Sequence, residues 1–228
     1  MTGTGTDVGK TYVSAMLVKK LREAGFDAGY YKPALSGAEV SPENGAPLGG
    51  DSARVCAVSG LQDAPNSLVS YLFKAPVSPH LASRLEGRPI LLEKLEADFA
   101  LARARFSFLT VEGSGGIVCP FCLDEAGENG SGRLLLEDVI TAFGLDLLIV
   151  ADSGLGTINA AALTAEYARL RGITVKGIIF NRYEPDNFMH SDNAAVVEML
   201  TGAPVIARIP AGATDLDLDA DRLVEFYA

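Results

Sequence analysis

Apolar residues gather in short, nearly continuous runs that are separated by longer amphipathic stretches. Four such runs lie at residues 106–111, 145–151, 175–180 and 204–209. Continuous apolar runs of this length are typical of strands that are buried on both faces, as they are in parallel sheets. The four runs therefore predict strands of a mostly parallel sheet.

The stretches between these runs have the spacing of helices. Residues 10–24 carry apolar side chains on one helical face, at Val13, Met16, Leu17 and Leu21. Gly25 follows at a position where glycine commonly ends a helix. Residues 158–170 are rich in alanine and leucine and end before Gly172. The alternation predicts an α/β fold, with helices on both faces of a mostly parallel sheet.

No internal repeat or long linker divides the chain. Residues 38–50 contain several prolines and glycines, and residues 124–132 are polar and rich in glycine. Both segments are expected to be exposed loops, and neither is long enough to separate two domains. We expect a single domain over residues 1–228.

The composition and net charge indicate which classes of partner the protein does not bind. The 228 residues carry a net charge of −10, and 48% of them are apolar. A sizeable core is therefore available, while no basic face for nucleic acid is visible. No apolar run of about 18 residues predicts a membrane span, the N-terminus lacks a secretory signal, and three cysteines argue against a disulfide framework. These features predict a cytoplasmic protein that binds neither nucleic acid nor membrane.

A glycine-rich segment at the N-terminus has the chemistry of a phosphate-binding loop. Residues 3–11 read GTGTDVGKT and open directly into the first expected helix. Glycines let backbone N–H groups curl around an anion, and a helix start adds partial positive charge. Lys10 is expected to neutralise the β- and γ-phosphate oxygens of ATP, and the Thr11 hydroxyl to ligate Mg²⁺. The loop is one residue longer than usual, since Thr4 replaces the usual glycine; the alternative is a plain glycine-rich turn.

A buried strand normally precedes such a loop, yet only Met1 and Thr2 precede Gly3. Either this strand is very short or the natural chain begins upstream. We favour the second alternative, because the loss of a central strand exposes the hydrogen-bonding groups of its neighbours.

Two acidic residues and one lysine are candidates for the same site. Glu112 closes the apolar run at 106–111, at the sheet edge where α/β proteins bind ligands; the alternative is an ordinary strand-end acid. Asp51 follows two glycines and is interpreted either as a second Mg²⁺ ligand or as a turn residue. Lys32 lies in a short apolar run before Pro33. It is expected either to reach the γ-phosphate from a strand end or, taken alone, to be a surface lysine.

Cys119 and Cys122 form a CxxC pair. A zinc site needs about two further ligands at matching spacing, whereas Cys56, His80 and His190 are scattered along the chain. We interpret the pair as small residues beside the site rather than as a zinc or redox motif.

Taken together, these motifs resemble those of dethiobiotin synthetases. The resemblance rests on GTGTDVGKT, YYKPALSG, GGDSARV, SPH, EGRPI, VEGSGG and a late FNR, in this order, and it extends from residue 3 to about residue 210. It implies a P-loop nucleotide-binding fold and the ATP-dependent conversion of 7,8-diaminononanoate and CO₂ (or bicarbonate) into dethiobiotin, ADP and phosphate. The implied cofactors are ATP and Mg²⁺, and the implied assembly is a homodimer with the diamine site at the interface.

The resemblance also implies roles for individual residues. Nucleotide contacts are implied for Thr6, Asp7, Val8, Gly9, Lys10, Thr11, Tyr12, Glu112, Gly115, Gly116, Asn181, Pro210 and Ala211. The implied Mg²⁺ ligands are Thr11, Asp51 and Glu112, and the implied catalytic residues are Lys10, Lys32 and Ser36. The implied substrate contacts are Thr6, Lys32 and Ser36, together with a helix start across the dimer formed by Gly154, Gly156, Thr157, Ile158 and Asn159. Asp7 stands where the family often has glutamate, so its reach is one methylene shorter.

The main alternative is a switch ATPase of the related partitioning class. Such proteins carry a second lysine near the start of the loop, and residues 3–8 contain none. Their membrane-bound members end in a basic amphipathic helix, whereas this chain ends in the acidic sequence DLDLDADRLVEFYA.

Overall fold

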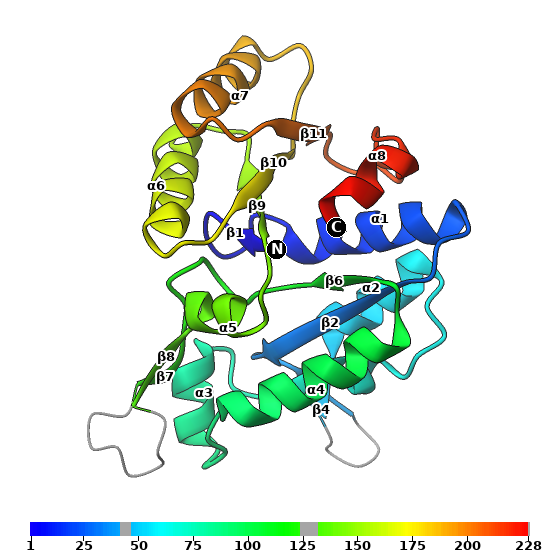
Figure 1. The fold of residues 1–228 in the computed structure, drawn as a ribbon, viewed down its shortest axis with the longest axis vertical. Coiled ribbons are helices and arrows are strands. Elements are labelled where there is room, and N and C mark those ends of the chain that lie inside the picture. Colours follow the sequence, from blue (N-terminus) through cyan, green and yellow to red (C-terminus); the bar gives the residue numbers. More distant parts are fainter. Residues whose placement is uncertain (42–46, 124–131, 228) are drawn as a thin grey trace.

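The computed structural model describes residues 1–41, 47–123 and 132–227 (Figure 1). The strands are β1 (Thr2–Gly3), β2 (Ala28–Leu35), β3 (Glu39–Val40), β4 (Pro47–Leu48), β5 (Val69–Leu72), β6 (Phe108–Val111), β7 (Pro120–Leu123), β8 (Arg133–Leu135), β9 (Leu147–Asp152), β10 (Val175–Asn181) and β11 (Val205–Ile209). The helices are α1 (Lys10–Glu23), α2 (Gly50–Ser59), α3 (Pro79–Leu85), α4 (Leu92–Arg105), α5 (Leu136–Ala142), α6 (Thr157–Leu170), α7 (Phe188–Thr201) and α8 (Ala220–Val224). Short 3₁₀ helices lie at Pro65–Leu68 and Glu225–Tyr227.

Two groups of parallel strands form the central sheet. One has the order β1-β9-β10-β11 and the other β5-β2-β6, and every pairing within them is parallel. The groups meet where the chain leaving β6 runs beside β1. There the Gly113 N–H donates to the Met1 carbonyl at 2.9 Å, and Gly3 forms a parallel bridge with Gly116. The antiparallel pairs β3–β4 and β7–β8 lie outside this sheet, so the predicted α/β class with a mostly parallel sheet is confirmed.

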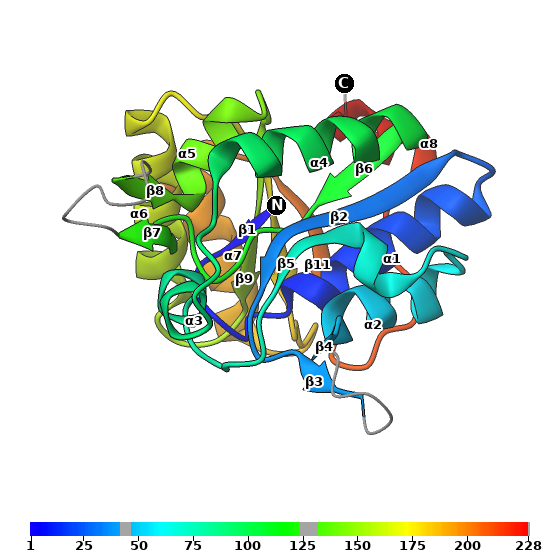
Figure 2. The ribbon, with the colours of Figure 1, turned by 90° about the horizontal axis from the view of Figure 1, so that it is seen from below.

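Helices cover both faces of the sheet, because neighbouring residues of a strand point to opposite sides. Tyr30 and Ile179 pack in one core cluster with residues of α1, α2 and α8. Tyr31 and Ile178 pack in a second cluster with residues of α4, α5, α6 and α7. Figure 2 shows α4 on one side of β2 and α1 and α2 on the other. The prediction of helices on both faces is confirmed.

The four apolar runs form β6, β9, β10 and β11, and the two amphipathic stretches form α1 and α6, all within two residues of the expected ends. Gly25 has a φ of 88°, as expected of a glycine that ends a helix. Strand β2 is longer than the short run expected around Lys32, and all eight of its residues are buried. Strand β2 therefore places Lys32 in the interior of the protein.

The first strand is present in a very short form. Thr2 pairs with Ile149 and Gly3 with Val150, both on β9. The glycine-rich loop is thereby anchored at the centre of the sheet. The expectation that the natural chain begins upstream stays a prediction.

The structure describes most of the first expected loop and only the end of the second. Residues 38–50 hold the small strands β3 and β4 and the start of α2, and residues 42–46 lie outside the described part. The prediction for residues 124–132 lies almost entirely outside it, since residues 124–131 are not described. Within the described ranges, no helix is both long and apolar enough to cross a bilayer.

Candidate functional site

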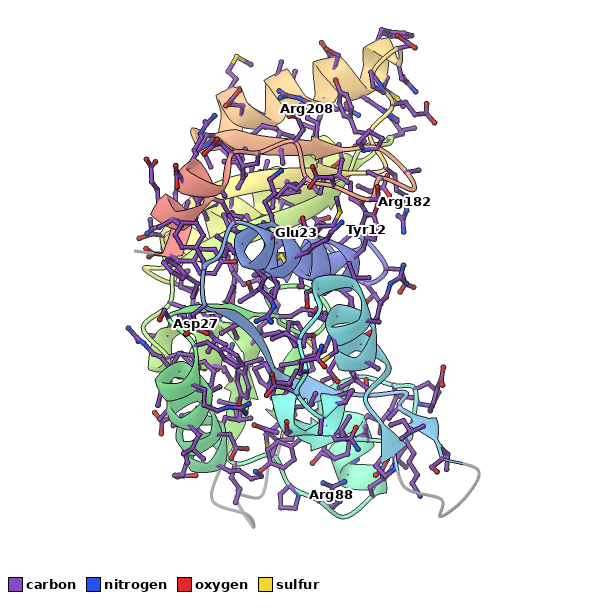
Figure 3. The ribbon with its side chains drawn as sticks, turned by 90° about the vertical axis from the view of Figure 1, so that its right-hand side faces the viewer. Tyr12, Glu23, Asp27, Arg88, Arg182 and Arg208 are labelled. Carbon is purple, nitrogen blue, oxygen red and sulfur yellow. The ribbon has the colours of Figure 1, made fainter. Side chains whose placement is uncertain are left out.

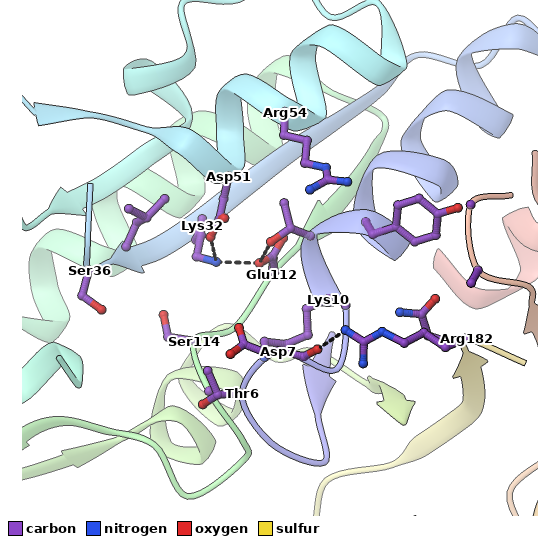
Figure 4. A pocket seen from close by; sticks show the side chains of 18 residues that line it. Thr6, Asp7, Lys10, Lys32, Ser36, Asp51, Arg54, Glu112, Ser114 and Arg182 are labelled. Atoms are coloured by element: carbon purple, nitrogen blue, oxygen red, sulfur yellow. Dashed lines mark hydrogen bonds and ion pairs between the residues drawn. The ribbon is translucent and has the colours of Figure 1, made fainter. Parts of the chain in front are cut away.

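A cleft of about 790 Å³ lies at the carboxyl ends of the parallel strands (Figure 4). Its walls come from the loop between β1 and α1, the end of β2, the start of α2 and the turns after β6, β10 and β11. The lining residues are Thr6, Asp7, Gly9, Lys10, Thr11, Tyr12, Lys32, Leu35, Ser36, Asp51, Arg54, Glu112, Ser114, Gly115, Asn181, Arg182, Ala211 and Gly212. Ligands of α/β proteins bind at this edge of the sheet, and the volume is typical of a ligand site.

The glycine-rich loop (residues 3–9) keeps its shape because two of its positions exclude a side chain. At Gly3, a Cβ atom would lie 2.6 Å from Cγ2 of Val8. Gly9 has a φ of 97°, and a Cβ atom there would lie 2.0 Å from Nδ2 of Asn181. Helix α1 starts directly after Gly9 without a side-chain cap. Its first N–H groups are therefore open to an anion.

Lys10 lies at the base of this loop. Its Nζ atom donates to the Gly5 carbonyl at 2.9 Å, and the residue is 8% exposed. Burial lowers the pKa of Lys10, although the Glu112 carboxylate nearby opposes this effect. The ammonium group supplies positive charge to any anion that the loop binds.

Glu112 is the centre of a buried polar cluster, and its side chain is fully buried. Its Oε1 atom accepts hydrogen bonds from Thr11 Oγ1 at 2.8 Å and from Lys32 Nζ at 2.5 Å. Its Oε2 atom accepts from Ser14 Oγ at 3.0 Å and from the Tyr30 hydroxyl at 2.9 Å. These donors compensate a charge that burial alone would make costly.

Lys32 joins this cluster to Asp51. Its Nζ atom lies 2.6 Å from Asp51 Oδ2, and the residue is only 5% exposed. Burial by itself lowers the pKa of Lys32, but the carboxylates of Glu112 and Asp51 outweigh it, and the pKa is raised. The interpretation of Lys32 as a surface lysine is wrong, because β2 is buried throughout. The interpretation of Asp51 as a turn residue is also wrong, because it lies in the first turn of α2.

Thr11, Asp51 and Glu112 bring one hydroxyl and two carboxylates to the same cleft. Such hard oxygen donors fit Mg²⁺, which commonly takes one or two carboxylates together with phosphate oxygens and water. Across residues 1–41, 47–123 and 132–227, no group of three or more His, Cys, Asp or Glu side chains is arranged to hold a metal. The fit is therefore to a cation that shares its coordination with a bound phosphate.

Most of the predicted nucleotide contacts line the cleft, and three do not. Val8 packs in a core cluster beneath the loop, and Gly116 forms the bridge to Gly3. Pro210 lines a neighbouring pocket instead. Asn181 lines the cleft, but its amide donates to the Val8 carbonyl at 2.9 Å. The roles assigned to these residues stay predictions.

The predicted diamine contacts at the start of α6 lie outside this cleft. They are Gly154, Gly156, Thr157, Ile158 and Asn159. Leu155, in the same turn, is 94% exposed. The Thr157 hydroxyl oxygen is buried and has no hydrogen-bond partner among the described residues. One copy of the chain therefore does not bring this turn into its own cleft.

Sequence reasoning misses five of the cleft residues, which are Leu35, Arg54, Ser114, Arg182 and Gly212. The first four lie inside the motifs that carry the family resemblance. The sequence therefore marks these segments, but it does not show which of their residues face the cleft. Arg54 lies over the Tyr12 ring, with 5.9 Å from its guanidinium carbon to the ring centroid. Ser114 donates to the Ala34 carbonyl at 2.6 Å. Only the tertiary structure brings these side chains to one cleft.

Comparison with known proteins gives a family match over nearly the whole chain. Residues 1–214 match the family described as "AAA domain". The ATP-dependent dethiobiotin synthetase BioD of Clostridium perfringens (strain 13) is 44% identical over 209 residues, which cover 91% of this chain and 88% of the relative. The protein of the same name from Clostridium botulinum (strain Alaska E43) is 41% identical over 227 residues, 100% of this chain and 96% of the relative.

Solved structures with a similar fold have low sequence identity to this chain. A ParA family ATPase from Chlorobium tepidum has a TM-score of 0.53 and 14% identity, and the match covers 99% of this chain and 86% of that one. The septum site-determining protein MinD from Pyrococcus horikoshii, complexed with Mg-ADP, has a TM-score of 0.53 and 17% identity over 92% of this chain and 79% of that one. At these identities the likeness shows the fold alone.

Proposed function

The chain belongs to the dethiobiotin synthetase family, and on that premise we propose that it closes the cyclic urea of dethiobiotin in biotin biosynthesis. The substrates are 7,8-diaminononanoate, CO₂ and ATP, and the products are dethiobiotin, ADP and phosphate. The activity is that of an ATP-dependent cyclo-ligase. We further propose that residues 1–228 act as one catalytic domain in the cytoplasm.

The observation that carries this proposal is the charge arrangement in the cleft. Lys10 and Lys32 are 8% and 5% exposed, and both interact electrostatically with Glu112. The protein as a whole carries a net charge of −10. Lys32 is paired with two carboxylates, whereas the Lys10 ammonium donates to a neutral carbonyl beside a loop with open N–H groups. Lys10 and these N–H groups therefore make a local site for a polyanion within an acidic protein. Such a site suits ATP and an anionic carbamate together.

The chemistry needs charge neutralisation and positioning rather than a protein nucleophile. One substrate amine takes up CO₂ and becomes a carbamate, and a carbamate oxygen accepts the γ-phosphoryl group as ADP leaves. The second amine then attacks the carbonyl carbon of this mixed anhydride, phosphate departs, and each amine has lost one proton. We assign the stabilisation of the anionic oxygens to Lys10 and Lys32, and a contact with the carbamate to Ser36 on the cleft wall.

The donor set of the cleft supports Mg²⁺ as the cation. Thr11, Asp51 and Glu112 would hold it. When bound, it neutralises charge on the β- and γ-phosphates. Lys32 contacts both carboxylates, so its ammonium group belongs to the same cluster of charges as the proposed Mg²⁺ ligands.

We propose a homodimer in which the start of α6 completes the partner's cleft. Thr157 offers a buried hydroxyl without a partner in the described part of the chain, and a helix start offers free N–H groups, which together suit the carboxylate of the diamine. The turn and the outer face of α6 expose Leu155, Leu163 and Leu170, which are 94%, 62% and 76% exposed. Exposed apolar side chains grouped along one helix favour a protein interface.

A switch ATPase of the partitioning class is the second candidate function. The observation in its favour is the fold shared with the ParA and MinD structures, at 14% and 17% identity. Against it stand relatives of 44% and 41% identity that are named dethiobiotin synthetases, and the absence of a lysine from residues 3–8. The first proposal is better supported.

Phosphate release from Mg·ATP tests the proposal. We expect rapid release only when 7,8-diaminononanoate and bicarbonate are both present. When either is left out, the rate should fall to the background set by a Lys10→Met variant. A rate that is indifferent to the diamine would favour the switch ATPase and contradict the proposal.

A further inference from the structure

Two residues of the described chain hold a left-handed backbone conformation without being glycine. They are Asp7, with a φ of 59°, and Arg182, with a φ of 55°. Asp7 lies in the glycine-rich loop, and Arg182 directly follows β10. Residues other than glycine rarely adopt this conformation unless their surroundings enforce it, and such residues cluster at functional sites.

These two residues contact each other. The Arg182 guanidinium donates through Nη2 to the Asp7 carbonyl at 2.6 Å, and Figure 4 shows this link at the edge of the cleft. Through Nη1 the same group pairs with Asp152 Oδ2 at 2.5 Å. The planar fork of one arginine thus joins the glycine-rich loop to the end of β9.

Asp152 extends this link to the turn before α6. Its Oδ1 atom accepts a hydrogen bond from the Gly154 N–H at 3.0 Å. Burial acts to raise the pKa of Asp152, but the hydrogen bonds from Gly154 and Arg182 outweigh it, and the pKa is lowered. The carboxylate is therefore ionised at neutral pH and holds both of its partners.

A second link between the same two segments runs through Asn181. Its side-chain amide donates to the Val8 carbonyl at 2.9 Å, and its own carbonyl accepts from Ser153 Oγ at 2.8 Å. Both Asn181 and Ser153 are buried, whereas the Arg182 side chain is half exposed and lines the cleft. The buried link fixes the backbone, and the Arg182 link is the one that a ligand in the cleft can reach.

We propose that Arg182 is a positioning residue that couples nucleotide binding in the cleft of its own subunit to binding of the substrate carboxylate at the start of α6, which completes the partner's cleft in the proposed dimer. The inference rests on the proposed function for the second of these sites. A nucleotide bound in the loop fixes the position of the Asp7 carbonyl. Through their hydrogen bonds, Arg182 and Asp152 then fix the position of the Gly154 turn as well. By thermodynamic linkage, the diamine must strengthen nucleotide binding by the same factor.

Calorimetric titration of 7,8-diaminononanoate with and without saturating Mg·ADP tests this coupling. ADP is used because it lacks the γ-phosphate that would contact the substrate directly. We expect Mg·ADP to tighten diamine binding about tenfold in the wild type, a factor common for coupled sites. In Arg182→Ala the factor should fall below about threefold. Arg182→Lys keeps the charge but loses the fork, so it should behave like the alanine variant.

Arg208→Ala is the matched control. Arg208 is an exposed arginine on β11 (Figure 3). Its guanidinium carbon lies 6.0 Å from the centroid of the Tyr183 ring, and the residue does not line the cleft. Its removal should leave the coupling factor unchanged. An Arg182→Ala protein that keeps the full factor overturns this inference alone, as does a wild type that binds the diamine without coupling. A wild type that does not bind the diamine at all overturns the proposed function too.

Discussion

The ammonium group of Lys32 lies 2.5 Å from Oε1 of Glu112, and neither side chain is more than 6% exposed. A buried charge pair adds little stability over apolar residues of the same volume, whereas the removal of one partner leaves the other charge uncompensated. The pair faces a cleft with a phosphate-binding loop on its other wall. We therefore attribute its presence to chemistry rather than to stability.

Lys32→Ala is expected to lose most turnover and to destabilise the protein. Glu112 would keep its hydroxyl donors but lose the ion-pair partner, at a cost of about 3–5 kcal/mol for a buried pair. Urea unfolding and phosphate release would measure the two effects. The double variant Lys32→Met/Glu112→Gln should regain stability without regaining turnover. A wild-type rate in Lys32→Ala would contradict the role of this lysine.

Lys10→Ala is expected to lose turnover while keeping its stability. The Lys10 ammonium donates to the Gly5 carbonyl of its own loop, so its removal leaves no buried carboxylate without its partner. Removal of one charge-stabilising donor commonly lowers kcat by about 10²–10³. Steady-state rates and urea unfolding of the same sample would test both halves of the prediction. A loss of stability as large as that of Lys32→Ala would show that the fold depends on Lys10 as much as on Lys32, which contradicts the prediction.

Tyr30→Phe is expected to destabilise the protein through Glu112. Burial, first, and the Glu112 carboxylate, second, raise the pKa of Tyr30, so its hydroxyl stays protonated and donates. A hydrogen bond to a charged group contributes about 1.5–3 kcal/mol, and urea unfolding would measure its loss. Tyr227→Phe is the control, because that hydroxyl bonds the neutral Thr110 hydroxyl and should contribute about 1 kcal/mol. Equal losses in the two variants would argue against a charged Glu112.

Much of the site follows from the sequence because its parts are local. The glycine-rich loop is contiguous with its helix, and Glu112 directly follows a nearly continuous apolar run in the sequence. The burial of Lys32 does not follow, because β2 reads AGYYKPAL and its glycine, proline and alanines carry little strand signal. The role of Arg182 does not follow from the sequence either, because its contacts with Asp7 and Asp152 join segments that only the sheet brings together.

Leu163→Glu is expected to break the proposed dimer. Leu163 lies on the exposed face of α6 and is 62% exposed, so a charge there would be buried without a partner in the interface. Sedimentation should show monomers, with Mg·ADP binding kept and diamine binding weakened. Leu101→Glu on α4 is the control, because Leu101 is 67% exposed on another helix. A wild type that sediments as a monomer would contradict the proposed assembly.

Cys119 is expected to react slowly with iodoacetamide. Burial raises the pKa of its thiol from the ordinary 9.0 to about 11, although Lys10 and Lys32 oppose this effect. At pH 8 this lowers the thiolate fraction about 100-fold, and the greater nucleophilicity of a more basic thiolate recovers about tenfold. Alkylation followed by peptide mass spectrometry should therefore be about tenfold slower than for an ordinary thiol, and should accelerate towards pH 11. Rapid labelling at pH 7 would support the redox role that we set aside.

Incorporation of labelled carbon tests the proposed reaction most directly. The enzyme would be incubated with Mg·ATP, 7,8-diaminononanoate and ¹³C-bicarbonate, and the products analysed by mass spectrometry. We predict a cyclic urea that carries one labelled carbon, formed in equal amount with the released phosphate. Phosphate release without a labelled cyclic product would contradict the account and leave a P-loop ATPase whose acceptor is a different molecule.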